Sequence, residues 1–408
     1  MNKEAMGLLL LASCLVIAEL PGSPGPQPSA ADFSTALTKM LRITWTTGPD
    51  LPQGFQDSSG GIVDNRLVTV DGFCSGQTKG VVNKPGKYPR GFLKKAWSLN
   101  LEVPESGWQP LPDFPGTPRQ GLSCISVKNK LYCWGGFSYS APFCYRDGYE
   151  LSRFHGRWEW NSLPELPWHA AGAGICAIGP KIYWMGGADY DREKFYTDSD
   201  RSGDTKRLGA RLLVFNTESK EARWKELPSC PGTPRWDAAL AAVNGKIYAI
   251  GGATGNDNPS SRYCTVVDNW EYDPARHVWK RLPDTPIASG NFPSGRIVFE
   301  NRYILLIGGF QYKNVLEPSG TPRPPFGSVF RHYRHNPYDS DVFVYDTLKN
   351  EFGKADPLPL NNNGPMTVLQ GSQINLIGGE TGGAVIDGEY FGHHPDLYLI
   401  GKISSSRP

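Results

Sequence analysis

The fold is decided by the stretch Lys246-Ile247-Tyr248-Ala249-Ile250-Gly251-Gly252, a short apolar run that ends in two glycines. The same pattern recurs, with a degenerate first copy, at residues 66–72, 130–136, 181–187, 303–309 and 374–379. Self-similarity at a period of about 50 residues indicates a fold built from repeated supersecondary units. The chain therefore contains six copies of one unit.

A second element occurs equally often. An aromatic residue is followed closely by Leu-Pro, and the pairs are Trp45 with 51–52, Trp108 with 111–112, Trp160 with 163–164, Trp224 with 227–228, Trp279 with 282–283 and Phe352 with 358–359. Apolar strands such as 213–216 and 342–346 precede most of these residues. Each unit is thus expected to hold four strands, with the Trp of the outer strand packed between neighbouring units.

The inner strand of each unit is small and apolar, as at 238–243, which suits sheets that crowd around a central channel. Asn244-Gly245 joins it to the second strand by a two-residue hairpin turn. The glycine pairs leave room for a turn against the neighbouring unit. These features predict an all-β protein, a six-bladed β-propeller.

Ring closure is also predicted. The last glycine pair is followed by one strand at 396–400 but by no Trp and Leu-Pro element. The strand with Trp45 can supply the missing outer strand, which closes the ring and removes exposed sheet edges. We expect one propeller domain over residues 43–403, preceded by a signal segment and linker over 1–30.

The repeated strand with its glycine pair, together with the Trp and Leu-Pro element, is similar to the kelch family over about residues 43–403. The resemblance implies a six-bladed kelch propeller closed by an N-terminal outer strand. The excess length of each repeat follows the glycine pair, so long loops emerge on one face, where binding groups are usually placed.

The N-terminus predicts export. Lys3 precedes the apolar run 7–18, which is short for a bilayer span and typical of a secretory signal. The box Leu11-Ala12-Ser13-Cys14 resembles a lipoprotein cleavage site, which would place a lipid anchor on Cys14. No later segment predicts a membrane span. We expect a periplasmic or extracellular protein.

Composition excludes some partners. The formal net charge is +2 over 408 residues, which offers no argument for nucleic acid. Of the eight cysteines, Cys124 and Cys133 fall symmetrically about a predicted hairpin turn, where they either face each other or serve as small buried apolar groups. No CxxC occurs, and we expect no cofactor.

The connections into the inner strands predict a ligand site at the channel mouth. Arg119 and Arg235 lie in two identical Gly-Thr-Pro-Arg stretches and suit a carboxylate or a hydroxyl-rich ligand; alternatively, each pairs with an acid such as Asp237 as structural support. Related positions are occupied by Asp57, His169, Trp236, Asn291 and Asn363. Loop aromatics such as Tyr145 suit either sugar stacking or a protein interface.

Histidines suggest a metal at first sight, but we predict none. His332 and His335 share a loop with Arg331 and Arg334, which would repel a cation, and His393-His394 precede a proline. Cys144-Tyr145 resembles a part of the copper radical oxidases, but the surrounding sequence does not match theirs.

Two stretches resemble the sialic-acid mutarotases (N-acetylneuraminate epimerases), which are exported six-bladed kelch proteins: 376–385 in the last blade and 114–119 before the second. The resemblance implies that an acid and a base open and close a sugar ring. In that family a catalytic Glu follows the glycine pair of the fourth blade, with an Arg a few residues on. Here Ala253 replaces the Glu, Arg262 matches the Arg, and Glu380, Asp237 or Asp257 would supply the acid and base.

Two hypotheses therefore stand. The chain binds a sugar or glycan on its long-loop face, with mutarotase-like epimerase (isomerase) chemistry. The alternative is a non-catalytic kelch interaction module for a protein segment.

Overall fold

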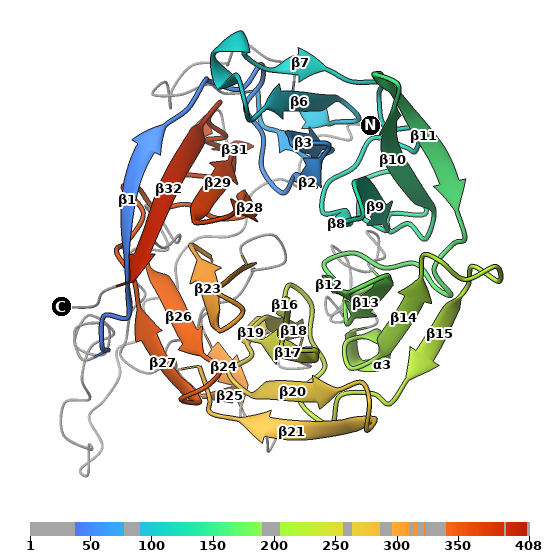
Figure 1. Cartoon of the computed structure of the whole chain (residues 1–408), viewed down its shortest axis with the longest axis vertical. Coiled ribbons are helices and arrows are strands. Elements are labelled where there is room, and N and C mark those ends of the chain that lie inside the picture. The colour runs from blue at the N-terminus through green and yellow to red at the C-terminus, as the bar shows by residue number, and fades with distance from the viewer. Residues whose placement is uncertain are drawn as a thin grey trace, which may run out of the picture.

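Six four-stranded antiparallel sheets stand around a central axis as blades (Figure 1). The computed structural model describes residues 37–76, 90–189, 205–255, 263–285, 296–309, 314–316, 322–323, 340–386 and 389–405. The predicted six-bladed β-propeller is confirmed. The signal segment and Cys14 lie outside the described residues.

Five blades follow the chain from the axis outward. They are β2 (Ser59–Val63), β3 (Arg66–Val70), β6 (Ala96–Asn100) and β7 (Gln109–Pro110); β8 (Ser123–Val127), β9 (Lys130–Trp134), β10 (Gly148–Phe154) and β11 (Arg157–Leu163); β12 (Gly174–Ile178), β13 (Lys181–Met185), β14 (Leu212–Asn216) and β15 (Trp224–Leu227); β16 (Ala239–Val243), β17 (Lys246–Ile250), β20 (Asn269–Asp273) and β21 (Val278–Leu282); and β22 (Arg296–Phe299), β23 (Tyr303–Ile307), β26 (Val342–Asp346) and β27 (Glu351–Lys354). We number these blades 1 to 5.

The sixth blade joins the two ends of the chain. Its strands are β28 (Met366–Gln370), β29 (Gln373–Ile377), β32 (Tyr398–Ser405) and, outermost, β1 (Leu41–Thr47). Trp45 pairs with Gly401, and a Cβ on that glycine would lie 2.6 Å from the indole ring. The prediction that the strand with Trp45 completes the last sheet is confirmed.

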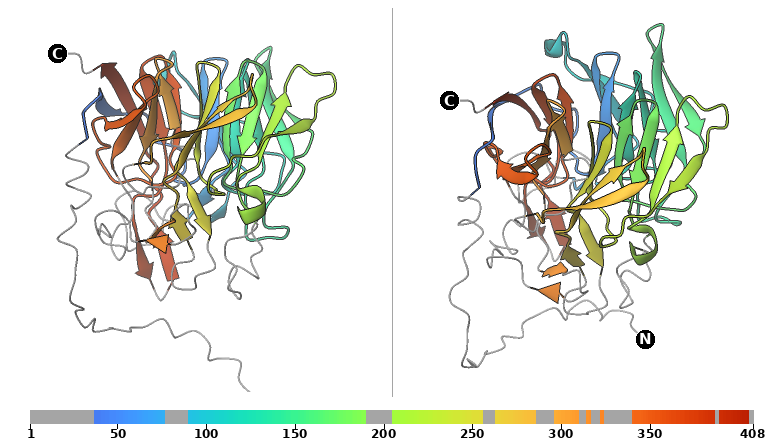
Figure 2. Two further views of the ribbon diagram at one scale, coloured as in Figure 1. Left: turned by 90° about the horizontal axis from the view of Figure 1, so that it is seen from below. Right: turned by 60° about the horizontal axis from the view of Figure 1, so that its bottom comes forward.

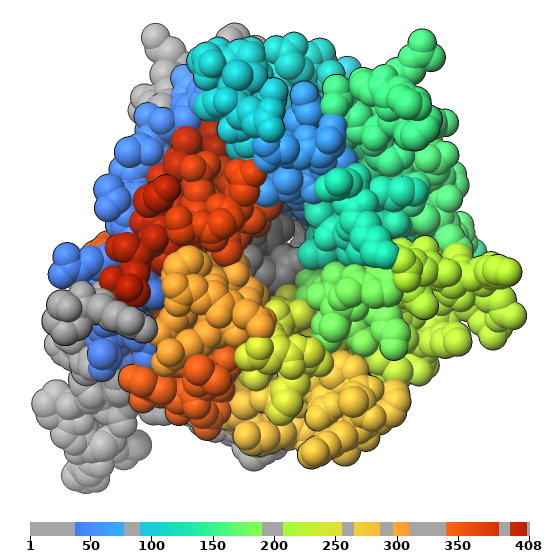
Figure 3. Space-filling view, viewed as in Figure 1, coloured from blue at the N-terminus to red at the C-terminus, as the bar shows by residue number. Residues whose placement is uncertain are grey.

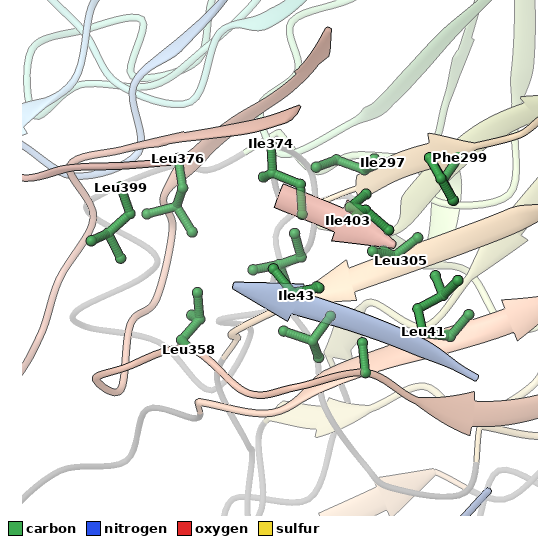
Figure 4. Packing of buried hydrophobic residues seen from close by; sticks show 14 of the residues in the cluster. Leu41, Ile43, Ile297, Phe299, Leu305, Leu358, Ile374, Leu376, Leu399 and Ile403 are labelled. Atoms are coloured by element: carbon green, nitrogen blue, oxygen red, sulfur yellow. The ribbon is translucent and has the colours of Figure 1, made fainter. Parts of the chain in front are cut away.

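The closing strand β1 also packs against the preceding blade. Leu41 and Ile43 alternate with exposed residues, and both side chains are buried in a cluster with Leu305 of blade 5 and Ile403 of β32 (Figure 4). Burying these aliphatic side chains stabilises the closure by roughly 1.5–3 kcal/mol each.

In five of the six repeats, the second glycine of the pair links its blade to the next. Its N–H donates to the carbonyl of a residue that precedes the next inner strand, at 2.9–3.1 Å; the pairs are Gly72 to Arg119, Gly136 to Ala170, Gly187 to Arg235, Gly309 to Asn362 and Gly379 to Phe55. These glycines have φ between +89° and +118°, a conformation that favours glycine. The repeated glycine is therefore a junction between blades, and the bond from Gly379 to Phe55 closes the ring.

The outer Trp residues form a second link between blades. The indole N–H groups of Trp108, Trp160 and Trp279 each donate to a proline carbonyl of the preceding blade, at 2.9–3.1 Å. Trp224 of blade 3 differs, because Trp134 donates to the Pro164 carbonyl at 2.9 Å. The Trp224 N–H has no acceptor among the described residues.

Replacing Trp279 by Phe should lower the free energy of unfolding by about 1 kcal/mol, because one inter-blade hydrogen bond is lost while the phenyl ring keeps most of the packing contacts. Trp224→Phe is the matched control and should cost less, since its N–H makes no such bond. Urea titrations of both variants test this. Equal losses would show that packing of the aromatic side chain, rather than the hydrogen bond, joins the blades.

The two faces of the propeller differ. One carries short turns, such as 64–65 and 244–245, and the other carries the inserts (Figure 2). The inserts form β4 (Phe73–Cys74) with β5 (Gly91–Phe92), a sheet of β18 (Ala253–Gly255), β19 (Tyr263–Thr265), β24 (Asn314–Leu316) and β25 (Pro322–Arg323), a hairpin of β30 (Gly383–Ile386) and β31 (Glu389–Gly392), and helix α3 (Thr205–Leu208). A 3-10 turn, Pro104–Ser106, precedes β7. We call the insert side the loop face.

The six inner strands surround a channel of about 330 Å³. Figure 3 shows its opening on the short-turn face. The lining is mostly small or aliphatic, with Gly60, Gly61, Ser123 and Ala241 among its members. Polar chemistry is therefore concentrated at the mouth on the loop face, where the chain enters each inner strand.

Candidate functional site

A ring of equivalent backbone positions surrounds the channel mouth. Each lies two residues before an inner strand and has φ between +48° and +67°; in the five blades where it is described, these positions are Asp57, Gly121, Gly172, Asp237 and Gly364. We call them the mouth ring. Left-handed backbone favours glycine and tolerates aspartate, which explains the residue types.

The mouth ring is held by its own backbone. Asp57 donates its N–H to the Gly364 carbonyl at 3.1 Å and accepts the N–H of Gly121 at 2.9 Å. Asp237 likewise donates to Gly172 at 2.6 Å. Each of these bonds joins neighbouring blades, so backbone contacts between blades hold both aspartates in place.

Each aspartate carboxylate lies over the glycine of the preceding blade. A Cβ on Gly364 would come within 2.2 Å of Asp57 Oδ1, and one on Gly172 within 2.6 Å of Asp237 Oδ1. These glycines therefore serve two purposes, because they adopt the left-handed conformation and leave space for the acids.

Asp57 and Asp237 stand on blades 1 and 4, on opposite sides of a six-membered ring. Burial raises the pKa of Asp57 from 3.8 to about 7. Burial raises the pKa of Asp237 well above its usual range, and the negative charge of Asp57 raises it further. Asp57 Oδ2 also accepts a hydrogen bond from Gln120 Nε2 at 3.0 Å. The two carboxyl groups are therefore coupled, since ionisation of Asp57 disfavours ionisation of Asp237.

A third acid, Asp71, supports the ring from within. It takes the place of the first glycine in the degenerate pair and is fully buried. Its carboxylate accepts the N–H groups of Ser59 at 2.8 Å and of Leu122, in the next blade, at 3.0 Å. Asp71 therefore clamps blades 1 and 2 rather than facing a ligand.

Arg119 and Arg235 are built into the scaffold, with side chains that are 0% exposed. Arg119 pairs with Asp147 at 2.6 Å and donates to the Gly135 carbonyl at 2.9 Å. Its guanidinium lies 3.6 Å from the centre of the Tyr145 ring. Of the two roles left open by the sequence, this geometry supports structural pairing, and it assigns Tyr145 to the same cluster.

Arg235 repeats this arrangement in blade 4. It pairs with Asp268 at 2.6 Å and donates to the Gly251 carbonyl at 3.2 Å. Asp268, not Asp237, is therefore its acid, which corrects the partner suggested from the sequence. Asn362 occupies the matching place in blade 6 and donates to the Gly378 carbonyl at 3.0 Å.

Glu380 lies beside the mouth ring in blade 6. It forms a two-bond backbone bridge with Asn363 at 2.8 and 2.9 Å, and both residues are buried. A Cβ placed on Gly392 would lie 2.5 Å from Glu380 Oε1 and 2.7 Å from His394 Nε2, so the carboxylate and the imidazole face the same point. The sequence offered no sign of this pairing.

His394 is held as a neutral ring. It is 1% exposed, and its Nδ1 accepts the N–H of Ser75 at 3.0 Å, which leaves the proton on Nε2. Burial lowers the pKa of His394 to about 3. The imidazole therefore stays neutral, with its proton on Nε2, across the physiological range.

An aromatic cluster adjoins the ring. It consists of Phe73, Phe92, Phe137 and Tyr139, with ring centroids 4.9–6.4 Å apart, and Tyr139 is 43% exposed. Phe73 and Phe137 bridge to Gln56 and Gln120, so the cluster is continuous with Asp57. These four residues follow the glycine pairs or lie in the inserts, and no sequence motif indicated them.

The remaining predicted residues are less central. Trp236, directly before Asp237, is buried, bridges to Ala253 and packs with Ala188. His169 is half-buried at the start of blade 3. Arg262, Asn291 and Asp257 lie outside the described residues. The structure thus brings Asp57, Asp237, Trp236, Asn363 and Glu380 to the channel mouth.

Two further findings concern ligands. No group of three or more His, Cys, Asp or Glu in the described part of the chain is placed to hold a metal ion. His393 instead contacts Thr381, with Nδ1 2.7 Å from Oγ1. No helix in the same part is long and apolar enough to cross a membrane.

Comparisons with known proteins give a kelch match and a set of relatives that share one name. Residues 234–286 match the Kelch motif. The chain is 25% identical over 366 residues to an N-acetylneuraminate epimerase of Pasteurella multocida (strain Pm70), covering 82% of this chain and 88% of that protein. It is 24% identical over 385 residues to the one of Haemophilus influenzae (strain 86-028NP), covering 86% and 93%.

A solved structure has the same fold. The structure of YjhT superposes with a TM-score of 0.62 at 16% identity, covering 89% of this chain and all of that one. The chain is a kelch-repeat β-propeller that resembles the N-acetylneuraminate epimerases in sequence.

Proposed function

We propose that this propeller binds a small sugar at the channel mouth of the loop face and accelerates the interconversion of its anomers. The observation that carries the proposal is the pair Asp57 and Asp237, two carboxyl groups with raised pKa values on opposite blades of the mouth ring. Carboxyl groups with perturbed pKa values at a concave mouth are candidates for acid and base roles.

The roles follow from the charges. Burial raises the pKa of Asp57 to about 7, a value that suits a general base, and its carboxylate takes the proton of the anomeric hydroxyl. Burial raises the pKa of Asp237 and the Asp57 charge raises it further, so Asp237 takes the role of the acid and donates a proton to the ring oxygen. The C1–O bond (C2–O in a ketose) breaks and a carbonyl forms; the reverse transfers close the ring on either face of that carbonyl. No atom is gained or lost, and no cofactor is required.

The aromatic cluster supports a sugar ligand. Pyranose rings present C–H faces that pack well on aromatic rings, and the cluster continues directly from the residues beside Asp57. Gln120 bridges to Phe137 and donates to Asp57 Oδ2 at 3.0 Å, so an amide group adjoins both the cluster and the carboxylate. A sugar stacked on these aromatic rings would also suit a protein that binds without catalysis. The experiment below has to distinguish this role from catalysis.

The relatives suggest which sugar to test first. Their printed name is N-acetylneuraminate epimerase, and similarity extends over most of both chains. Ala253 occupies the position of the family Glu and is buried against Trp236. The acid and base therefore have to come from another place, and Asp57 with Asp237 supplies one.

Export remains part of the proposal. Its support is Lys3 and the apolar run 7–18, together with the cleavage box at Cys14. Intact-mass measurement of the protein purified from its source tests it: a mature chain shortened at the N-terminus, with or without a lipid on Cys14, is expected, and a full-length chain would contradict it.

The catalytic proposal is tested by NMR exchange spectroscopy. Purified protein is added to equilibrated N-acetylneuraminate and, separately, to neutral aldoses, and the α-to-β exchange rate is measured. Faster exchange than in buffer is expected for at least one sugar. Line broadening or a binding isotherm without faster exchange would favour the non-catalytic role, and no effect with any sugar would overturn the proposal.

A further inference from the structure

Blade 2 contains two cysteines that face each other directly. Cys124 of β8 and Cys133 of β9 are strand partners, and their Sγ atoms lie 2.6 Å apart. The turn between the strands is Lys128-Asn129, with φ of +48° and +60°, typical of a two-residue hairpin.

The register of this hairpin gives the two cysteines a spacing that suits a disulfide bond. Val127 and Lys130 flank the two-residue turn and form the hydrogen-bonded pair that closes it. Hydrogen-bonded and non-bonded pairs alternate, so Cys124 and Cys133, three pairs further on, form a non-hydrogen-bonded pair. In such pairs the Cα atoms are about 4.5 Å apart and the side chains are closest. That spacing lies within the range that disulfides span, about 4.4–6.8 Å.

The two cysteines differ in access. Cys124 is 7% exposed and lines the central channel, whereas Cys133 is 0% exposed in the core of the blade. A small reagent that enters the channel therefore reaches Cys124 first, and Cys133 stands beside it. Among the described cysteines that have strand partners, no other is paired with a cysteine; Cys74, Cys144, Cys176 and Cys264 pair with other residue types.

We propose that Cys124 and Cys133 form a redox-modification site, in which oxidation by a small disulfide links the first two strands of blade 2. The Cys124 thiolate attacks glutathione disulfide, releasing one glutathione and leaving a mixed disulfide. The Cys133 thiolate then attacks the Cys124 sulfur and releases the second glutathione. The protein loses two protons and two electrons, and glutathione disulfide is reduced to two thiols.

Peptide mapping tests the site in the full chain. The folded protein is equilibrated with glutathione disulfide or with dithiothreitol, its remaining thiols are blocked with iodoacetamide under denaturing conditions, and it is digested with trypsin. Cleavage after Arg119, Lys128, Lys130 and Arg146 places the two cysteines on separate peptides, 120–128 and 131–146. A linked peptide is expected in the oxidised sample alone. Both cysteines fully alkylated in that sample would overturn the proposal.

Peptide 131–146 also contains Cys144, so a variant identifies the partner. Cys144→Ser should keep the link, while Cys124→Ser and Cys133→Ser should each abolish it. A link lost in Cys144→Ser and kept in Cys133→Ser would also contradict the pairing. Circular dichroism confirms that each variant is folded, and oxidation should raise the Tm of the natural protein but not that of Cys124→Ser.

Discussion

Asp57→Asn should lower kcat/KM for sugar anomer exchange by ~10²-fold or more, the usual loss when a general base is removed. Asparagine accepts the same left-handed backbone and keeps the size of the side chain, so the mouth ring should survive. NMR exchange rates over a range of sugar concentrations provide the measurement.

The matched control for this variant is Asp64→Asn. Asp64 also has positive φ, +49° against +48° for Asp57, but it lies in a short turn on the opposite face. Its side chain is 49% exposed and pairs with Arg66 and Arg153, and surface pairs of this kind contribute little. Asp64→Asn should keep full activity. Full activity in a folded Asp57→Asn would remove Asp57 from the mechanism.

Asp57→Asn should also stabilise the protein at high pH. The folded pKa of Asp57, about 7, lies above the ordinary value of 3.8, so between these values the folded state binds more protons than the unfolded state. Stability is therefore lost as pH rises from about 4 to about 7. Asn avoids this loss, so Asp57→Asn should have the higher Tm at pH 8, with the gap closing towards pH 4. An active-site residue that costs stability is expected where function requires a buried charge.

Arg235→Met should lower the free energy of unfolding by ~3–5 kcal/mol. Arg235 and Asp268 are 0% and 5% exposed at their side chains and lie 2.6 Å apart, and removing one partner leaves the other charge buried without compensation. Burial alone would raise the pKa of Asp268, but Arg235 and the hydrogen bonds from Thr233 and Trp270 hold it below the usual range. Urea titration at pH 7 measures the loss.

Two further variants separate the possible causes. Arg211→Met is the matched control, because Arg211 precedes the third strand of blade 3 and pairs with Glu226 at 2.6 Å with both partners about a third exposed or more. It should cost no more than ~1 kcal/mol. The double variant Arg235→Met with Asp268→Leu should recover much of the loss, since no charge is left buried. Weaker sugar binding by Arg235→Met, at unchanged stability, would instead restore the ligand role considered from the sequence.

The acid partners of Arg119 and Arg235 could not be predicted from the sequence. The repeated Gly-Thr-Pro-Arg stretches marked both arginines as special, but their acids are 28 and 33 residues away across an insert. A guanidinium at a channel mouth serves either a ligand or the scaffold, and only burial and partner geometry separate the two. For Asp57 the sequence predicted the position but not the raised pKa, because that pKa depends on surroundings contributed by several blades.

Sequence alone determined the number of blades, the closure by the strand with Trp45 and the single face for the inserts. These features are written in local repeats: a glycine pair that needs positive φ, an indole that reaches the neighbouring blade, and a tight turn between adjacent strands. Tertiary structure decided which polar groups are buried, which carboxyl groups influence each other's ionisation, as Asp57 does that of Asp237, and which side chains meet, as Glu380 and His394 do. Burial and electrostatic coupling depend on distances in space, and closing the ring brings together residues that are far apart along the chain.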